Sequence, residues 1–300
     1  MQVITSKDNE LIKSIKKLKE KKYRDAYGKF VIEGIKLIGE AIQENADIEC
    51  IVICEDCMKE NCIDKKLMYE IAKKNCVYVN SKVFNTITDV SNPQGILAVV
   101  KRADTSEKIN YDEDAIIVLD GIQDPGNLGT ILRTVDSANL KQIVISKETA
   151  DVFNSKVVRS TMGAIFRVNV VRSDDLVHDL IEMKNNGFKV VVTSLDTNDS
   201  VYDVNYMKKV IVIGNEANGV SKEVQEIADN KVKIPMLGKT ESLNASVAAG
   251  ILIYEYIRAK LDLGDVGKKS FSRLSVRRSF WGLSKSSVPT DTDNHPLTNL

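Results

Sequence analysis

The chain has 300 residues, and its 42 Lys and Arg side chains balance 42 Asp and Glu side chains. This length allows one large domain or two of moderate size, whereas the zero net charge excludes no class of partner. No apolar run approaches the ~18 residues of a membrane span, and the polar residues 1–9 are unlike a secretory signal. The sequence therefore predicts a cytoplasmic protein without membrane contact.

The first 36 residues are strongly basic, with ten Lys or Arg against five acidic residues. Leu11, Ile12, Ile15 and Leu18 recur at helical spacing, which predicts a basic amphipathic helix. Beyond it, "KFVIEGIKLIGEAIQ" predicts a strand and a helix, and a further helix is expected over 65–74. Short apolar strands are expected at "ECIVIC", "CVYVN" and "GILAVV". Residues 1–100 thus predict a small α/β domain, and the polar residues 101–114 predict a linker.

All five cysteines crowd into the first domain: Cys50, Cys54, Cys57, Cys62 and Cys76. An odd number without a signal peptide predicts reduced thiols in the cytoplasm. Cys54 and Cys57 form a C-x-x-C, but no second pair follows at zinc-finger spacing. Ordinary thiols are therefore favoured, with zinc binding as the alternative.

From residue 115 onward, strongly apolar strands alternate with helices. The expected strands are "AIIVLDG", "QIVIS", "FRVNVV", "FKVVVTSL", "KKVIVIGNE" and the short "KVKIPM". This alternation predicts an α/β domain over 115–263, with a mainly parallel sheet covered by helices on both faces. Its last helix is expected near residues 244–261. The Ser-rich residues 264–300 predict a disordered tail or a tag, with an RNA-contacting tail as the alternative.

Three strand ends carry unusual polarity, and ligands of parallel α/β sheets bind at such ends. They are "LDGIQDPGNLGTILRT", "IVIGNEANGVS" and "IPMLGKTESLNAS". No strand precedes G-x-G-x-x-G, and the P-loop reading of "GKT" fails because Lys233 occupies the position of its first glycine. The only histidines, His178 and His295, predict neither a catalytic triad nor a metal site. Any catalysis must therefore use Arg, Asn, Ser, Glu and backbone amides.

In this order and at this spacing, "DPGNLGTILRT", "VIVIGNEANGVS" and "IPMLGKTESLNASVAAG" resemble the three signature motifs of the SpoU (TrmH-type) RNA ribose methyltransferases, of the SPOUT superfamily. "KKYRDAYGKFVIEG" more loosely resembles the start of that family's substrate-binding domain, which has a ribosomal-protein-like fold. The resemblance implies a C-terminal trefoil knot, a homodimer with shared active sites, and S-adenosylmethionine as methyl donor. It further implies that the cofactor pocket is lined by Ser194, Leu195, Gly214, Ile234, Met236 and Leu243.

The resemblance also places the catalytic residues. Arg133 matches the essential arginine, proposed for the family as the base; a guanidinium resists deprotonation, which favours a phosphate clamp instead. Asn127 is expected at the start of the same helix, where it can cap the helix while also orienting Arg133 or RNA. Glu216 is expected to hold a partner side chain, such as an arginine of the other subunit. Ser242 and Asn244 are expected near the methyl donor and the ribose, with helix capping as the alternative.

The resemblance further implies an RNA substrate, and 23S ribosomal RNA in particular, because family members with an N-terminal substrate domain generally modify it. A tRNA enzyme and a catalytically silent RNA-binding protein of the same fold are the alternatives; a dehydrogenase is opposed by the missing glycine motif. Cationic side chains neutralise phosphates, and tyrosines can stack on unpaired bases. The RNA contacts are predicted at Lys16, Lys17, Lys21, Lys22, Tyr23 and Arg24, with Tyr27 as a second stacking residue.

Overall fold

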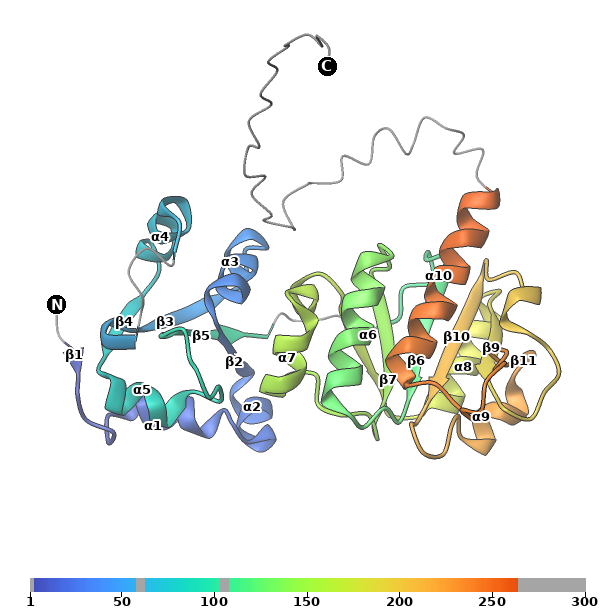
Figure 1. The fold of residues 1–300 in the computed structure, drawn as a ribbon, viewed down its shortest axis with the longest axis horizontal. Helices are drawn as coiled ribbons and strands as arrows, with labels where there is room; N and C mark the ends of the chain where they lie inside the picture. Colours follow the sequence, from blue (N-terminus) through green and yellow to red (C-terminus); the bar gives the residue numbers. More distant parts are fainter. Residues whose placement is uncertain (1–2, 58–62, 103–107, 264–300) are drawn as a thin grey trace, which may run out of the picture. The chain divides into compact units, whose positions relative to one another are not determined.

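The computed structural model describes residues 3–57, 63–102 and 108–263 (Figure 1). The predicted tail over 264–300 lies outside the described residues, as does the middle of the predicted linker. Two sheets organise the described chain, and each is covered by helices on both of its faces. None of the helices in these ranges combines the length and apolarity that crossing a membrane would require.

The first sheet has five strands in the order β1-β4-β3-β5-β2. β1, β4 and β3 run parallel, whereas β5 runs antiparallel to both β3 and β2. The strands are β1 (Val3–Ile4), β2 (Lys29–Glu33), β3 (Ile48–Cys54), β4 (Cys76–Val79) and β5 (Ile96–Lys101). The helices are α1 (Glu10–Lys17), α2 (Lys21–Tyr27), α3 (Ile35–Gln43), α4 (Lys65–Ala72) and α5 (Ser81–Ile87).

Helices cover this sheet because each has one apolar face. Ile12 and Ile15 of α1 share a buried cluster with Phe84 of α5 and one face of the strands. On the opposite face, Ile38 of α3 and Ile71 of α4 form a second cluster. The predicted basic amphipathic helix is thereby confirmed as α1, which ends at Lys17 before α2 starts.

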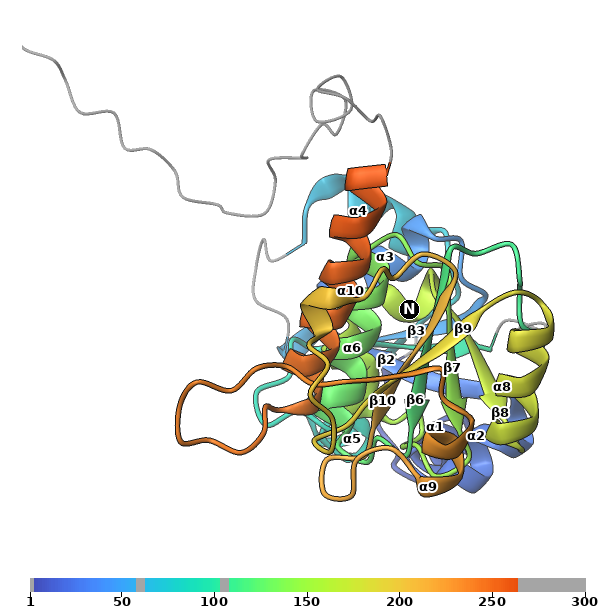
Figure 2. The ribbon, with the colours of Figure 1, turned by 90° about the vertical axis from the view of Figure 1, so that its right-hand side faces the viewer.

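The second sheet has six parallel strands in the order β11-β9-β10-β6-β7-β8 (Figure 2). These are β6 (Ala115–Asp120), β7 (Gln142–Ser146), β8 (Asn169–Ser173), β9 (Lys189–Thr193), β10 (Lys209–Gly214) and β11 (Asn230–Val232). The helices are α6 (Pro125–Ser137), α7 (Ser155–Thr161), α8 (Leu176–Asn185), α9 (Lys222–Ile227) and α10 (Ala245–Leu263). Short 3-10 turns are η1 (Glu55–Cys57), η2 (Ala164–Phe166) and η3 (Val201–Asp203).

Alternate residues of β6 face opposite helical layers. Ile117 is buried with side chains of α6, α7 and α10, whereas Ile116 is buried with side chains of α8 and α9. The prediction of a mainly parallel α/β sheet with helices on both faces is confirmed. The predicted last strand is shorter than expected, since β11 ends at Val232 and Pro235, which has no amide hydrogen to donate, soon follows.

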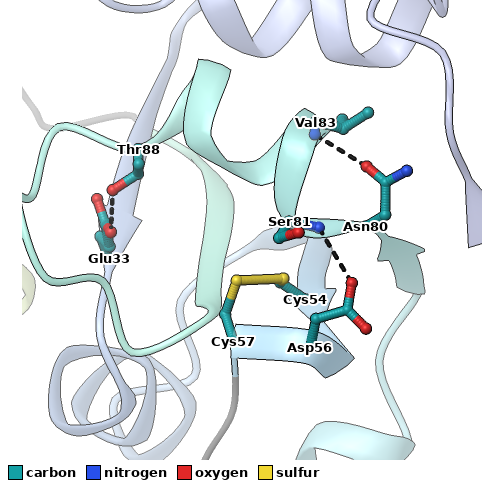
Figure 3. The surroundings of a disulfide bond; sticks show 8 residues. All are labelled: Glu33, Cys54, Asp56, Cys57, Asn80, Ser81, Val83 and Thr88. Atoms are coloured by element: carbon teal, nitrogen blue, oxygen red, sulfur yellow. Dashed lines mark hydrogen bonds between the residues drawn. A yellow bond between two sulfur atoms is a disulfide. The ribbon is translucent and has the colours of Figure 1, made fainter.

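The cysteines differ from their prediction in one respect. Cys54, at the end of β3, forms a disulfide with Cys57, at the end of η1 (Figure 3). The expectation of reduced thiols is wrong for this pair, because three residues of a tight turn bring the two sulfurs together. Burial raises the pKa of the Cys50 thiol to about 11, which keeps it protonated and unreactive. In the described ranges, no group of three or more His, Cys, Asp or Glu side chains could hold a metal ion.

Candidate active centre

The first two motifs meet where β6 and β10 end side by side in the sheet. The Glu216 carboxylate, just beyond β10, accepts hydrogen bonds from the backbone amides of Gln123 and Asp124, both at 3.2 Å. A third bond comes from Asn127 Nδ2 at 3.0 Å. One carboxylate therefore fixes the loop that leads from β6 into α6.

Asn127 connects all three motifs. Its Nδ2 donates to Glu216, and its Oδ1 accepts from Asn244 Nδ2 at 2.9 Å. α6 starts at Pro125, and the Asp124 carboxylate caps it by accepting from the Asn127 amide at 2.8 Å. The prediction that Asn127 caps this helix is therefore wrong. Its side chain, only 8% exposed, joins the motifs instead.

Asn244 belongs to the third motif and has two roles at once. Its Oδ1 accepts from the amide of Ser246 at 2.9 Å and from the Ser246 hydroxyl at 2.6 Å, which caps the start of α10. Its Nδ2 reaches Asn127. Capping and motif contact, which the sequence presents as alternatives, occur together because they use opposite ends of one amide.

The protonation of Glu216 follows from its partners. Partial burial alone would raise the pKa of this carboxyl, but the hydrogen bonds from Asn127 and from the two loop amides outweigh burial and lower it. Glu216 is therefore ionised at neutral pH, with both oxygens engaged. This arrangement suits an anchor for the loop, not a proton acceptor. The predicted partner was an arginine of a second subunit; within this chain the partners are amides.

Arg133 and Ser242 stand apart from this network. Arg133 lies on α6 beyond Asn127, is exposed, and within the described residues its guanidinium has neither a hydrogen bond nor an ion pair. Ser242 is also exposed and, across the same ranges, its hydroxyl bonds to no other group. The structure thus joins Asn127, Glu216 and Asn244 but leaves these two side chains open to a ligand.

The residues predicted to line a cofactor pocket lie on three neighbouring loops. β11, β9 and β10 are adjacent in the sheet, and their carboxyl ends carry these residues. Ser194 and Leu195 follow β9, Gly214 ends β10, and Ile234, Met236 and Leu243 follow β11. The site is apolar yet open: Leu195 is 73% exposed and Leu243 36% exposed.

Gly214 has a steric reason to be glycine. The chain folds back over it through paired backbone bonds between Asn215 and Gly219, each 2.9 Å. A Cβ at position 214 would come within 2.1 Å of the backbone of Gly219. The tight turn from Asn215 to Gly219 therefore places backbone amide and carbonyl groups at the end of β10, where they can contact a flat ligand.

Comparison with known proteins identifies the arrangement. Residues 114–254 match the model of the SpoU rRNA methylase family, and residues 9–98 match the MRM3-like substrate binding domain. The chain is 33% identical over 255 residues to the 23S rRNA (guanosine(2553)-2'-O)-methyltransferase RlmP of Bacillus subtilis, covering 85% of this chain and 98% of the relative. The chain belongs to the SpoU rRNA methylase family.

Solved structures of RNA methyltransferases agree with this assignment. An RNA 2'-O ribose methyltransferase superimposes with a TM-score of 0.75 at 28% identity, covering 87% of this chain and all of the other. An AdoMet-bound rRNA methyltransferase from Sinorhizobium meliloti gives 0.73 at 30% identity, covering 88% of this chain and 98% of the other. The motif resemblance found in the sequence is therefore confirmed.

Most residues predicted to touch RNA form one surface on α1 and α2 of this SpoU protein. Lys17, Lys21 and Lys22 are exposed, and Lys16 is half-buried. The Tyr23 and Tyr27 rings stack with centroids 5.8 Å apart. The ammonium groups of Lys17 and Lys22 lie 5.5 and 4.7 Å from the centre of the Tyr23 ring. We call the surface formed by Tyr23, Tyr27, Lys17 and Lys22 the tyrosine platform.

Arg24 does not belong to this surface. It is 4% exposed, and its guanidinium donates to Asp151 at 2.6 Å and to the carbonyls of Leu18 and Lys19 at 2.7 Å. The prediction that Arg24 contacts RNA is therefore wrong. Arg24 follows Lys21 by three positions on α2, but its side chain is buried, because a carboxylate 127 residues away in the sequence binds it.

A cavity of about 680 Å³ opens at the same sheet edge, but on the face covered by α8 and α9. None of the predicted site residues lines it. Its charged lining consists of one lysine, Lys147, and five carboxylates: Asp120, Glu148, Asp174, Asp175 and Glu223. Such a lining repels phosphate, so an RNA strand is better accommodated on the face of α6 and α7.

Two contributors to the centre escaped the sequence reasoning. The amides of Gln123 and Asp124 hold Glu216, yet backbone donors leave no residue-type signal. Lys156 of α7 approaches the Asp124 carboxylate to 3.6 Å although it belongs to no motif. Only the Asp-Pro pair at 124–125, which favours a helix start, could have located the cap.

Proposed function

We propose that this SpoU-family protein methylates a ribose 2′-hydroxyl in RNA, with 23S ribosomal RNA as the substrate and S-adenosylmethionine as the methyl donor. The observation that carries the proposal is the joining of Asn127, Glu216 and Asn244, one residue from each motif, beside an unpaired Arg133. The names of the RlmP relative and of the S. meliloti enzyme support the substrate and the donor. A cytoplasmic location accords with an RNA substrate of this kind.

The three neighbouring loops fit S-adenosylmethionine. Exposed Leu195 and Leu243 offer apolar contacts for a flat adenine ring, and the tight turn at Gly214 offers backbone groups for its polar edge. When bound, the donor supplies an electrophilic methyl group. The protein's own tasks are then to hold the ribose in line with that group and to help the hydroxyl lose its proton.

Arg133 is the residue suited to hold the RNA. A guanidinium keeps its charge at any physiological pH and can bind two phosphate oxygens at once. We therefore assign it to a phosphate of the target nucleotide, whose oxygens can accept the hydroxyl proton. Glu216 does not take that proton, because its oxygens already accept three hydrogen bonds that hold the loop before α6. Ser242, exposed and unbonded in the described chain, is assigned to the incoming ribose.

We further propose a homodimer and a knotted chain. On α10, Val247 and Tyr254 are 51% and 54% exposed, and Tyr254 lies 3.4 Å from Ser137 of α6. These exposed apolar side chains of α10 support a second copy packing beside Arg133 of α6 and completing the site. For the knot, the support is that Lys233 bonds to the backbone of Asp199 and Val201, while α10 shares the core beneath that loop.

Transfer of tritiated methyl from S-adenosylmethionine tests the substrate. Ribosomal RNA and tRNA should come from a strain that lacks this protein, so that the target is unmodified. We expect label in 23S rRNA with the wild type and none with Arg133→Ala. Label in tRNA alone would move the protein to the tRNA enzymes. No label in either RNA, with RNA binding intact, would favour the silent RNA-binding alternative.

A further inference from the structure

α7 connects the catalytic helix to the first sheet. Against α6 the packing is close, since a Cβ at Gly129 would lie 2.4 Å from Ser160 Cβ and 2.7 Å from the Val157 carbonyl. α7 lies against β2 (Figure 1), and Val158 of α7 is buried in the cluster formed with side chains of β2 and α3. No motif and none of the predicted RNA contacts falls on α7. Its polar side is therefore an unassigned surface between two assigned ones.

Lys156 places a cation at the edge of the active centre. Its ammonium lies 3.6 Å from the Asp124 carboxylate, which caps α6, and its side chain is 59% exposed. An exposed pair at this distance stabilises the fold little. The lysine can therefore turn to a phosphate at small cost.

Arg159 lies one turn further along the same side of α7, because positions three apart are neighbours on a helix. Arg159 is half-buried and, within the described residues, makes neither a hydrogen bond nor an ion pair, but against the effect of burial its charge helps Lys19 to lower the pKa of Asp89. It lines a small cavity together with Lys19 and Asp89. Lys19 bonds to Asp89 at 2.9 Å and comes from the turn between α1 and α2, next to the tyrosine platform.

Ion pairs at both ends of α7 fix its position relative to α2, α3 and α6. The buried Arg24 guanidinium, one residue from Tyr23, binds Asp151, and Asp151 also accepts from the Phe153 amide just before α7. Beyond α7, Arg167 binds Glu40 of α3 at 2.7 Å and Asp136 of α6 at 2.9 Å. The tyrosine platform, α7 and α6 are thus joined by direct contacts.

We propose that Lys156 and Arg159 bind two backbone phosphates of the RNA strand that runs from the tyrosine platform to the active centre. This inference rests on the proposed function, because it names a further contact for the same substrate. These cations position the RNA and carry no choice of sequence. Their loss therefore weakens every RNA equally and leaves the methyl donor's affinity unchanged.

The test uses full-length Lys156→Gln/Arg159→Gln, with Lys141→Gln/Lys189→Gln as the matched control. The control removes two exposed charges from the amino-terminal edge of the second sheet, away from the centre. Binding of poly-uridylate and of a 23S rRNA transcript is measured between 0.05 and ~0.3 M salt. Binding to single-stranded RNA weakens with salt, and the logarithm of the association constant falls linearly with the logarithm of the salt concentration. Loss of two phosphate contacts should make this slope shallower by about 1.4 than in the wild type, equivalent to about 25-fold weaker binding at 0.1 M.

The control should keep the wild-type slope, and Lys156→Arg/Arg159→Lys should restore it, since charge is what binds phosphate. Donor binding measured by calorimetry should be unchanged, which also shows that each variant is folded. An unchanged slope in the first variant, or an equal change in the control, would overturn the inference. Failure of the wild type to methylate rRNA would instead reject the proposed function, because the poly-uridylate slopes do not depend on methylation.

Discussion

Asn127 and Arg133 stand on the same helix, yet their surroundings differ completely. Asn127 is 8% exposed, and its side-chain amide hydrogen-bonds to Glu216 and Asn244, so its position is fixed before any ligand binds. Arg133 is exposed and, in the described chain, unpaired. The difference separates two tasks. The start of α6 builds the frame of the site, and the middle of α6 offers a charge to the substrate.

Arg133→Ala gives the largest effect that this comparison predicts. Loss of one preorganised charged donor costs roughly 10²–10³-fold in rate, and we expect the upper end because no described residue can substitute. Thermal stability and donor affinity should stay at wild-type values, because the guanidinium holds nothing in the fold. Single-turnover methylation and calorimetry check this, with Lys141→Ala as control. A variant that turned over normally would remove Arg133 from the mechanism.

Asn127→Ala should damage both fold and activity. It leaves Asn244 Nδ2 without its acceptor and takes one of three donors from Glu216, which costs about 2 kcal/mol in unfolding free energy. Turnover should fall about 100-fold as the motifs separate. Urea unfolding measures the stability, and Asn186→Ala, at an exposed amide after α8, should change it by less than ~0.5 kcal/mol. Equal stability of the two variants would contradict the framing role.

Gly129→Ala tests whether α7 sets the position of α6. The added methyl would meet Ser160 and the Val157 carbonyl, and such overpacking costs about 1–3 kcal/mol. We expect activity to fall with stability, since α6 carries both Asn127 and Arg133. Gly250→Ala is the matched control: its methyl would meet nothing within 4 Å, and alanine favours a helix interior. A Gly129→Ala variant with wild-type stability and activity would show that contacts other than those with α7 position α6.

The smallest expected effect is the acid response of Glu216. Its pKa is lowered in the fold, so its contribution is full above the ordinary glutamate pKa and is lost as pH falls through the lowered value. Glu216→Gln should cost on the order of 1 kcal/mol at pH 7, and the difference from the wild type should shrink toward pH 3. Denaturant unfolding from pH 7 to pH 3 measures this difference in unfolding free energy, with Glu223→Gln at an exposed carboxylate as the control. A difference independent of pH would mean that the charge of Glu216 plays no part.

Local patterns predicted the strands from β2 to β11 and five of the ten described helices (α1, α3, α4, α6 and α10), because alternation and helical spacing are properties of neighbouring residues. They also brought Asn127, Glu216 and Asn244 to strand ends and helix starts. The partners of those residues were beyond such reasoning. Arg24 looked like one more cation of a basic helix until the fold paired it with Asp151. The cap of α6 was misassigned because Asp124 and Asn127 are both good capping residues, and only backbone geometry distinguishes them.

The most direct test of the central claim is where the methyl group ends up. RNA labelled by the wild-type protein with tritiated S-adenosylmethionine is hydrolysed in alkali, which cannot cleave beside a 2′-O-methylated ribose. Label recovered in an alkali-resistant dinucleotide is the predicted result, and sequencing that dinucleotide identifies the target. Label recovered in mononucleotides would show methylation of a base, and would contradict the assignment of Arg133, Asn127 and Asn244 to a ribose hydroxyl.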